Sequence, residues 1–448
     1  MFWNIFCNFV GGKENSMKRL VIKNIGPIKD VDIELKRFNV FIGPQSSGKS
    51  TIAKLISTFS WLEKEACTTL SEDILPDKKD FISFIEDYHR IHGYFDKDKS
   101  VVKYESDFVT IIYDKGDFSV ALKSNCTDYL RVKVSYVPSD RNVITVRDIE
   151  KRELGETNFR SFLFDWLEAR RAFDSQSMAD MLSLDVKYYY DKERTQYQDR
   201  ITHHNGQSYD ISLYDASSGL QSAVPLIVLL TYLKEMYYEN YGKEISFESQ
   251  KRENDLVIRL IENLLMPYVQ HNENETPVSI FRRVSTEMVN GNHEYRQYFE
   301  NIQKSLNNLN GPHSISYIIE EPEQNLFPQT QGDLVQYIIS SCNIAEHLSS
   351  AVITTHSPYL LAMLNILILA GILLDSGVTE SRIDNILHVN SAIRPSEIAV
   401  CTVGDGTSIS IINPDTGLID QNHLDTASEY NAAIFDQLYS IYIESLIK

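Results

Sequence analysis

Residues 38–56, FNVFIGPQSSGKSTIAKLI, constrain the fold of this chain more than any other stretch. The apolar run 38–42 is typical of a buried strand, and an amphipathic helix pattern follows a few residues later. Between them lie four residues that fit the spacing GxxxxGK[ST]: Gly43, Gly48, Lys49 and Ser50. A strand, a glycine-rich loop and a helix in this order predict a phosphate-binding loop.

The chemistry of such a loop explains its residue types. Gly43 and Gly48 let the backbone turn its N–H groups toward a phosphate, beside the positive end of a helix. We expect Lys49 to reach the β- and γ-phosphates of ATP and the Ser50 hydroxyl to ligate Mg²⁺. The predicted nucleotide-binding residues of the loop are Gly43, Pro44, Gln45, Ser46, Ser47, Gly48, Lys49, Ser50 and Thr51.

Residues 314–328, SISYIIEEPEQNLFP, supply a second apolar run that ends in acids. The run 315–319 suits a buried parallel strand, and acids at its carboxyl end would lie beside the phosphate-binding loop. We assign Glu320 to the Mg²⁺ shell, directly or through water. Glu321 is the candidate general base that orients the attacking water.

A third apolar run precedes a histidine in SAVITTHSPYLL, residues 350–361. His356 at the tip of that strand would be able to contact the γ-phosphate. The predicted catalytic residues are therefore Lys49, Glu321 and His356.

The stretch DASSGLQSA, residues 215–223, precedes a long apolar run, 224–232, that predicts a buried helix. Ser217 is a good N-cap residue, and a cap alone would account for the pattern. The alternative is an anion site at the helix N-terminus, formed by Ser217, Ser218, Gly219 and Gln221.

Four motifs occur in order and together resemble the ABC-type ATPase clade of the SMC, RecF and OLD-like proteins. GPQSSGKST resembles Walker A, SSGLQS the ABC signature, IIEEPEQNLFP Walker B with a D-loop, and TTHSP the switch-histidine loop. The resemblance implies an α/β fold of the P-loop ABC-ATPase head type, with a mixed central sheet, a flanking antiparallel sheet and helical insertions. It also implies a head-to-tail homodimer in which the signature binds the γ-phosphate of ATP held by the partner.

Most relatives have Asp where this chain has Glu320. No glutamine matches the Q-loop of the family. Asp140 and Arg141, in VSYVPSDRNV, end a strand pattern at the corresponding place. They would face the nucleotide or the partner, or form an ordinary surface salt bridge.

The expected organisation has seven parts. It comprises a leader (1–16), an N-terminal ATPase lobe (17–147), a helical insertion (148–200), a signature segment (201–243), a second helical insertion (244–310), a Walker B and switch-histidine lobe (311–375), and a tail of strands and a helix (376–448). In VKYYYDKERTQYQDR, residues 186–200, the aromatic and basic residues would either stack nucleic acid or form a packed tyrosine cluster.

Composition narrows the class of protein. The 448 residues carry a formal net charge of -19, which argues against a uniformly basic nucleic-acid surface. Five scattered cysteines without a CxxC pair predict reduced thiols in a cytoplasmic protein. The longest apolar run, 359–374, is interrupted by Asn365 and Gly371 and predicts a buried helix rather than a membrane span.

The motifs resemble the ATPases of bacterial antiphage systems such as Septu and PARIS. This implies an ATPase that dimerises around Mg-ATP and controls a separate effector, a nuclease or a toxin. A DNA-repair or DNA-end-binding ATPase and an ATP-binding scaffold with negligible turnover are the alternatives.

Overall fold

The computed structural model of the protein describes residues 18–75, 80–146, 149, 152, 154–203, 209–241, 279, 282, 286, 311–420 and 434–439. The expected leader (1–16) and nearly all of the second insertion (244–310) lie outside these residues. So does most of the expected final helix.

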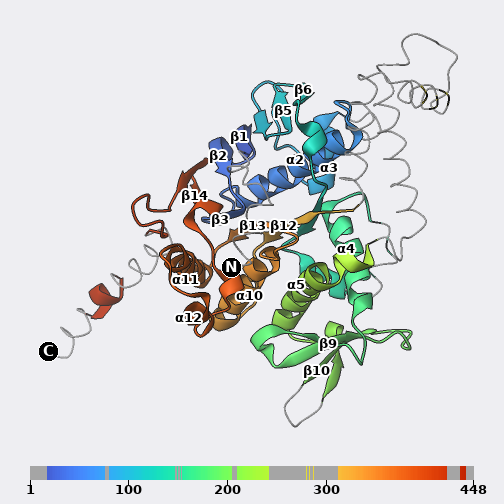
Figure 1. Cartoon of the computed structure of the whole chain (residues 1–448), viewed down its shortest axis with the longest axis vertical. Coiled ribbons are helices and arrows are strands. Elements are labelled where there is room, and N and C mark those ends of the chain that lie inside the picture. Colours follow the sequence, from blue (N-terminus) through green and yellow to red (C-terminus); the bar gives the residue numbers. More distant parts are fainter. Residues whose placement is uncertain are drawn as a thin grey trace.

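An eleven-stranded sheet runs through the middle of the molecule, in the order β6-β5-β4-β1-β2-β15-β14-β3-β13-β12-β7 (Figure 1). Its strands are β1 (Lys18–Ile25), β2 (Ile28–Leu35), β3 (Phe38–Ile42), β4 (Val101–Glu105), β5 (Val109–Asp114), β6 (Asp117–Leu122), β7 (Val132–Val137), β12 (Ser314–Glu320), β13 (Ser350–Thr355), β14 (Ile398–Gly404) and β15 (Thr407–Ser410).

The half of the sheet from β14 to β7 is parallel throughout. In its register Ile42 pairs with Thr355, and Glu320 pairs with Thr354. The carboxyl ends of β3, β13 and β12 therefore meet at one edge. That pairing places the three chain segments that follow these strands next to one another.

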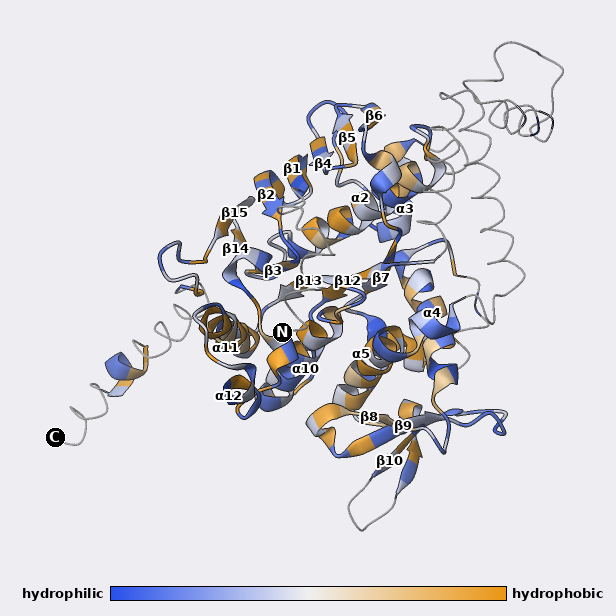
Figure 2. Cartoon of the chain, in the orientation of Figure 1, coloured by the Kyte–Doolittle hydropathy of each residue, from blue (hydrophilic) through white to orange (hydrophobic). Residues whose placement is uncertain are grey.

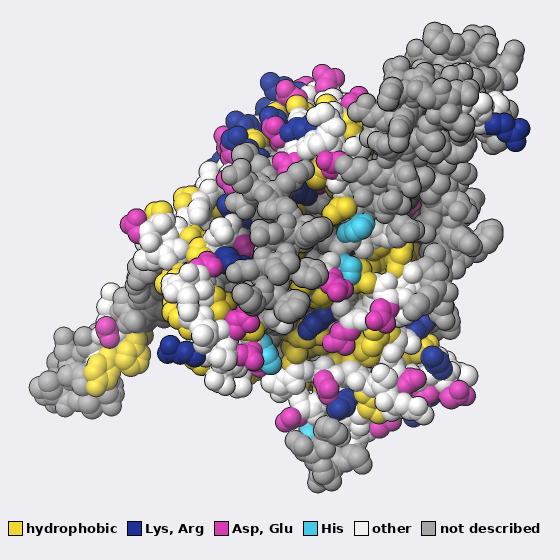
Figure 3. Space-filling model, in the orientation of Figure 1, with side chains coloured by type: hydrophobic (Ala, Val, Ile, Leu, Met, Phe, Trp, Pro, Cys, Tyr) yellow, Lys and Arg dark blue, Asp and Glu magenta, His cyan; other side chains and the backbone are white. Residues whose placement is uncertain are grey.

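The other half of the sheet is mostly antiparallel, and its outer face is charged. The β1–β2 and β1–β4 pairs are both antiparallel. Lys and Arg side chains there lie among Asp and Glu side chains over β1, β2 and β5 (Figure 3). Arg19 pairs with Asp32 at 2.5 Å and Lys103 with Glu105 at 3.0 Å. The positive charge of this face is therefore largely balanced by neighbouring acids.

Alternate side chains of the parallel strands face two different cores. On β3, Phe38, Val40 and Ile42 belong to one core and Phe41 to the other. The helix α2 (Lys49–Thr69) and α3 (Phe81–His89) fill the core on the Phe41 side. The opposite core is covered by α4 (Asn158–Ala169), α5 (Ser218–Glu235), α10 (Pro328–Cys342) and α11 (Pro358–Asp375).

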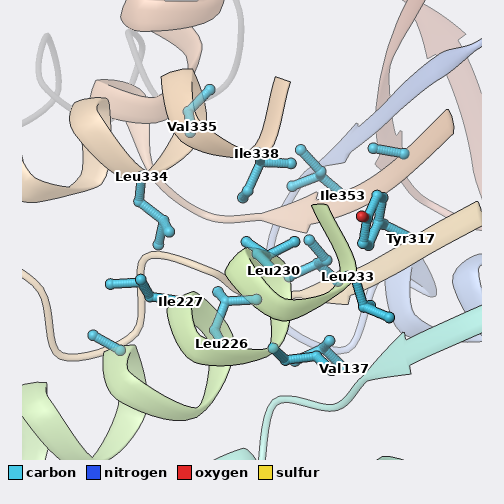
Figure 4. Packing of buried hydrophobic residues seen from close by; sticks show 14 of the residues in the cluster. Val137, Leu226, Ile227, Leu230, Leu233, Tyr317, Leu334, Val335, Ile338 and Ile353 are labelled. Atoms are coloured by element: carbon cyan, nitrogen blue, oxygen red, sulfur yellow. The ribbon is translucent and has the colours of Figure 1, made fainter. Parts of the chain in front are cut away.

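The helix α5 is the centre of that second core. Leu226, Ile227, Leu230 and Leu233 point toward α10 and toward the strands that carry Tyr317 and Ile353 (Figure 4). All residues from 222 to 230 are buried. The expected buried helix over 224–232 is confirmed.

The sequence predicts that α11 is a buried helix, but only one side of it is buried. Among the described helices, α11 alone has the length and composition of a membrane span. Within the structure, 39% of it is buried. Leu360, Leu364 and Leu367 are buried, whereas Ile366 and Leu369 are exposed. Its orange colour runs all round the helix in Figure 2, so an apolar face remains on the surface.

The expectation of a helical insertion over 148–200 holds for α4 and is wrong beyond it. A separate antiparallel sheet follows, in the order β11-β10-β9-β8. Its strands are β8 (Ala179–Asp180), β9 (Val186–Tyr190), β10 (Asp199–His203) and β11 (Asp210–Ser212). Tyr188 is buried against Trp166, with ring centroids 5.6 Å apart, and aromatic residues with alternating burial favour a strand. Tyr188 is therefore packed in the core, whereas Tyr197 is 41% exposed.

The tail takes part in the central sheet. The expected strands in 376–448 are confirmed as β14 and β15, and β14 lies between β15 and β3. Two further short helices are α6 (Tyr237–Asn240) and α12 (Glu380–Asp384), and the four described cysteines are free.

Candidate functional site

At two positions of the loop after β3, the backbone has a conformation that only glycine adopts readily. Gly43 has φ 153° and Gly48 has φ 109°. A Cβ atom on Gly43 would lie 2.1 Å from the carbonyl oxygen of Val403, and one on Gly48 would lie 2.9 Å from Cγ1 of Ile28. Both glycines are therefore required by conformation and by space.

Lys49 opens α2 and turns its head back into this loop. Its Nζ donates to the carbonyl oxygens of Gly43, at 2.9 Å, and Pro44, at 2.7 Å. The residue is 4% exposed. Burial lowers the pKa of the ammonium group, and the charges of Glu321 and Glu323 oppose that shift. A positive charge is thus held inside the loop.

The loop has the polar groups that a nucleotide phosphate needs. The N-cap Gly48 gives α2 no side-chain cap, and no acid stands in its first turn. The Ser47 Oγ is buried and has no hydrogen-bond partner among the described residues. Uncapped amides, an unpartnered hydroxyl and a lysine fit a bound phosphate chain.

Glu320 ends β12 as a buried carboxyl group, 5% exposed. The Tyr136 hydroxyl, at the end of β7, donates a hydrogen bond to its Oε1. Burial raises the pKa of Glu320, while Lys54, Tyr136 and Ser139 act in the opposite direction. Sequence reasoning missed Tyr136, because its role depends on the pairing of β7 with β12.

Glu321 faces His356 across the edge of the sheet. The distance from His356 Nε2 to Glu321 Oε1 is 3.2 Å. The Glu321 backbone has φ 44°, and its N–H donates to the carbonyl oxygen of Thr354 at 2.9 Å. A carboxylate beside an imidazole at the phosphate-binding edge is a suitable arrangement for proton transfer from water.

Glu323 is a further acid of the site that sequence reasoning missed. Its Oε1 accepts hydrogen bonds from the His356 N–H, at 2.6 Å, and from the Thr355 hydroxyl, at 2.8 Å. Its Oε2 is buried and has no hydrogen-bond partner among the described residues. Burial raises the pKa of this carboxyl group. Glu323 thus holds the backbone of the histidine loop.

Asp140 and Arg141 separate in the structure. Asp140 forms a surface ion pair with Arg90 at 3.0 Å. Arg141 is completely buried and donates to backbone carbonyl groups. A surface salt bridge is therefore the correct interpretation for Asp140, and Arg141 faces neither solvent nor a partner.

The stretch 217–221 begins α5 on the surface. The Ser217 Oγ accepts from the Leu220 N–H at 3.5 Å, and Ser217 and Ser218 are exposed. The Gln221 side chain turns inward and donates to the carbonyl oxygens of Leu213 and Tyr214. The geometry of an N-cap is therefore present at Ser217.

The helices that follow the two parts of the predicted site pack on different faces of the sheet. The helix α2, after the phosphate-binding loop, packs in one core, and α5 packs in the other against α4 and α10. The structure brings Lys49, Glu320, Glu321 and His356 to one sheet edge. The start of α5 packs beside the segment that follows the two acids, because a Cβ atom on Gly219 would lie 2.9 Å from the carbonyl oxygen of Asn325.

Residues 17–314 match the AAA ATPase domain family. The chain belongs to this family. The parallel sheet and the glycine-rich loop before α2 agree with an ATPase domain that has an α/β fold and a phosphate-binding loop. A search of curated proteins found no match.

Several solved structures are similar to this AAA ATPase domain protein. The SMC head domain from Thermotoga maritima has 10% identity and a TM-score of 0.34, covering 88% of this chain and 98% of that one. An Smc head domain bound to the C-terminal domain of ScpA, from Pyrococcus furiosus, has 12% identity and a TM-score of 0.37, covering 94% and 100%. An ATP-binding cassette of an ABC transporter has 11% identity and a TM-score of 0.30, covering 88% and 90%. Correspondences this loose carry no functional inference.

The buried Glu320 carboxyl group generates a prediction about stability and pH. Its raised pKa means that the folded state favours the protonated form, so its contribution to stability is fully present at low pH and is lost as pH rises through the folded pKa. Glu320→Gln, measured without nucleotide or Mg²⁺, should therefore have a higher free energy of unfolding than the parent protein at pH 7. The difference should shrink as pH falls toward the ordinary glutamate value of 4.5.

Urea denaturation at several pH values measures this difference. Glu346→Gln, at an exposed position, is the matched control and should leave the free energy of unfolding almost unchanged. A Glu320→Gln protein that is less stable than the parent at pH 7 would show that the charged carboxylate is stabilising in the fold.

Proposed function

We propose that this protein binds and hydrolyses ATP and closes as a head-to-tail dimer around two Mg-ATP molecules. The observation that carries the proposal is the meeting of the phosphate-binding loop, the Glu320–Glu321 pair and His356 at one sheet edge. Membership of the AAA ATPase domain family makes hydrolysis to ADP and phosphate the expected activity.

Each residue has a task in that reaction. The amides of 43–48 and Lys49 bind and orient the phosphates, and Ser50 and Glu320 would hold Mg²⁺. No group of three or more His, Cys, Asp or Glu side chains in the described part of the chain could hold a metal ion, so phosphate oxygens and water would complete the coordination. Bound Mg²⁺ would neutralise charge that develops on the phosphates. Glu321 accepts a proton from the attacking water, and His356 orients the γ-phosphate.

A second copy supplies the remaining part of the site. Within one chain, α5 and α2 pack in the two opposite cores of the sheet, and Ser217 and Ser218 at the start of α5 are exposed. In a two-fold dimer, Ser217, Ser218 and Gly219 of each copy would face the γ-phosphate bound by the other. Two equivalent ATP sites follow from the symmetry.

The output we propose is control of a separate effector, a nuclease or a toxin, in bacterial antiphage defence. This role rests on the sequence resemblance. The mixed charges of Figure 3 and the net charge of -19 give no support to a DNA-binding role for the visible face.

Light scattering of the Glu321→Gln protein, with and without Mg-ATP, tests the proposal. Removing the base should trap ATP, so the protein should shift from monomer to dimer on adding Mg-ATP. Adding Ser218→Arg should abolish the shift, because a large cation at the start of α5 would obstruct the interface. Ser381→Arg, at an exposed serine of α12, is the matched control and should leave the shift intact. Binding of ATP without any change in mass would contradict the dimer.

Glu323 provides a prediction about turnover. Glu323→Ala removes the acceptor for the His356 N–H and the Thr355 hydroxyl, so the histidine loop loses its position. We expect kcat for ATP hydrolysis to fall by about tenfold or more while ATP affinity changes little. Glu323→Gln keeps one oxygen acceptor and should retain more activity than the alanine variant. Equal loss in both variants would show that the negative charge, and not the acceptor geometry, is what matters.

A further inference from the structure

Arg141 is the most unusual buried side chain near the site. It lies in the turn after β7 and is 0% exposed. Five hydrogen bonds leave its guanidinium group, and all five end on backbone carbonyl oxygens. An arginine side chain has five N–H donors, so its capacity is used completely.

The acceptors belong to two separate parts of the fold. Nη1 and Nη2 donate to the carbonyl oxygens of Glu320 and Glu321, both at 2.9 Å, and Nη2 also reaches Pro322 at 3.3 Å. Nε donates to the carbonyl oxygen of Ser222, in α5, at 2.9 Å. The remaining bond, at 3.4 Å, goes to Pro138 in the turn itself. One planar group thus joins the end of β12 to the second turn of α5.

Burial is unfavourable for the positive charge of the Arg141 side chain. Burial lowers its pKa to about 10, and the charges of Glu323, Glu321 and Glu320 act against that shift. Among the described residues, no carboxylate oxygen accepts a hydrogen bond from the guanidinium group. A buried cation without a hydrogen-bonded acid is costly, and a neutral side chain would fill the same space more favourably. Its presence therefore points to a task beyond filling the core.

The backbone at the catalytic end depends on this contact. Glu321 has the left-handed φ of 44°, which is unfavourable for a residue with a side chain. Its N–H is held by the Thr354 carbonyl oxygen and its own carbonyl oxygen by Arg141. Hydrogen bonds on both peptide groups of Glu321 thus fix the backbone that directs its side chain toward His356.

The first turns of α5 lack one of the usual hydrogen bonds within the helix. Pro225 lies inside α5 and has no N–H, so the Gln221 carbonyl oxygen lacks its usual helical donor. The next carbonyl oxygen, of Ser222, is the one that Arg141 binds. Asn325 makes a second, weaker connection, because its Nδ2 donates to the Ser222 hydroxyl at 3.1 Å. The first turns of α5 are therefore held largely from the β12 side.

We propose that Arg141 is a positioning residue that couples Glu321 to the first turns of α5. Movement of the Glu321 backbone when Mg-ATP binds is transmitted through the guanidinium group to Ser217, Ser218 and Gly219. Each protomer's own nucleotide then prepares the surface that the protomer offers to its partner's nucleotide. This inference rests on the proposed function.

Hydrogen–deuterium exchange with mass spectrometry tests the coupling in the full chain. The Ser218→Arg background removes the proposed dimer contact, so any change in α5 arises within one protomer. Adding the Mg²⁺ complex of AMP-PNP should slow exchange in a peptide covering 217–224 by roughly threefold or more. In Arg141→Lys that nucleotide effect should disappear, while AMP-PNP affinity stays within roughly threefold of the parent. Lysine keeps the charge but cannot span both sets of carbonyl groups.

Asn325→Ala is the matched control, and it should keep most of the nucleotide effect. A purely structural role for Arg141 would lower stability yet leave the nucleotide-dependent difference intact in the folded protein. That result would overturn the coupling and leave the ATPase proposal standing. Failure of the Ser218→Arg protein to bind AMP-PNP would instead overturn the proposed function.

A second variant covers the case in which Arg141→Lys does not fold. Arg141→Gln is neutral and carries two N–H donors in place of five, and it should also lose the effect. The Ser218→Arg protein with Arg141 intact provides a test that needs no change at position 141. If AMP-PNP binds there and leaves exchange at 217–224 unchanged, the coupling is wrong.

Discussion

Parallel pairing of β3 with β13, and of β13 with β12, is the constraint on which the rest of the structure depends. The phosphate-binding loop precedes the paired acids by more than 260 residues, and His356 follows Glu321 by 35 residues. All three segments meet because three parallel strands end at one edge. A hydrophobic core packs on each face of these strands, one formed with α2 and the other with α5, α10 and α11. A shift of register by one residue in β12 would exchange Ile318 and Ile319 between those cores and would turn Glu320 away from Tyr136.

Several charged side chains of the site are held by hydrogen bonds to uncharged groups. Lys49 is bound by loop carbonyl oxygens, Arg141 by strand and helix carbonyl oxygens, and Glu320 by a tyrosine hydroxyl. Glu323 binds the backbone of the histidine loop and keeps one oxygen unpartnered among the described residues. Polar groups fixed in this way require little reorganisation when a charged ligand enters. A buried carboxyl group with a raised pKa is unfavourable for stability at neutral pH, which is a common feature of functional sites.

The sequence predicted the local parts of this site well. The spacing of Gly43, Gly48, Lys49 and Ser50, and the apolar runs before Glu320 and His356, depend only on neighbours in the chain. What could not be predicted depends on distant contacts. Arg141 has an ordinary surface-like context in VPSDRNV, and only the packing of α5 against the end of β12 buries it. Tyr136 and Glu323 gain their roles from neighbouring strands in the same way. The strands β8 and β9 were mistaken for helix, because short aromatic runs give a weak period.

We propose that each ATP site is built from two copies of the chain, and mixing two inactive proteins tests this proposal most directly. Lys49→Ala has a damaged loop and an intact α5 start, and Ser218→Arg has the reverse. Each protein alone should show almost no ATP hydrolysis. Mixed in equal amounts, they should form heterodimers with one intact site, and activity should rise well above that of either parent. A mixture that stays as inactive as its parents, or a Ser218→Arg protein as active as the unmodified chain, would contradict the account.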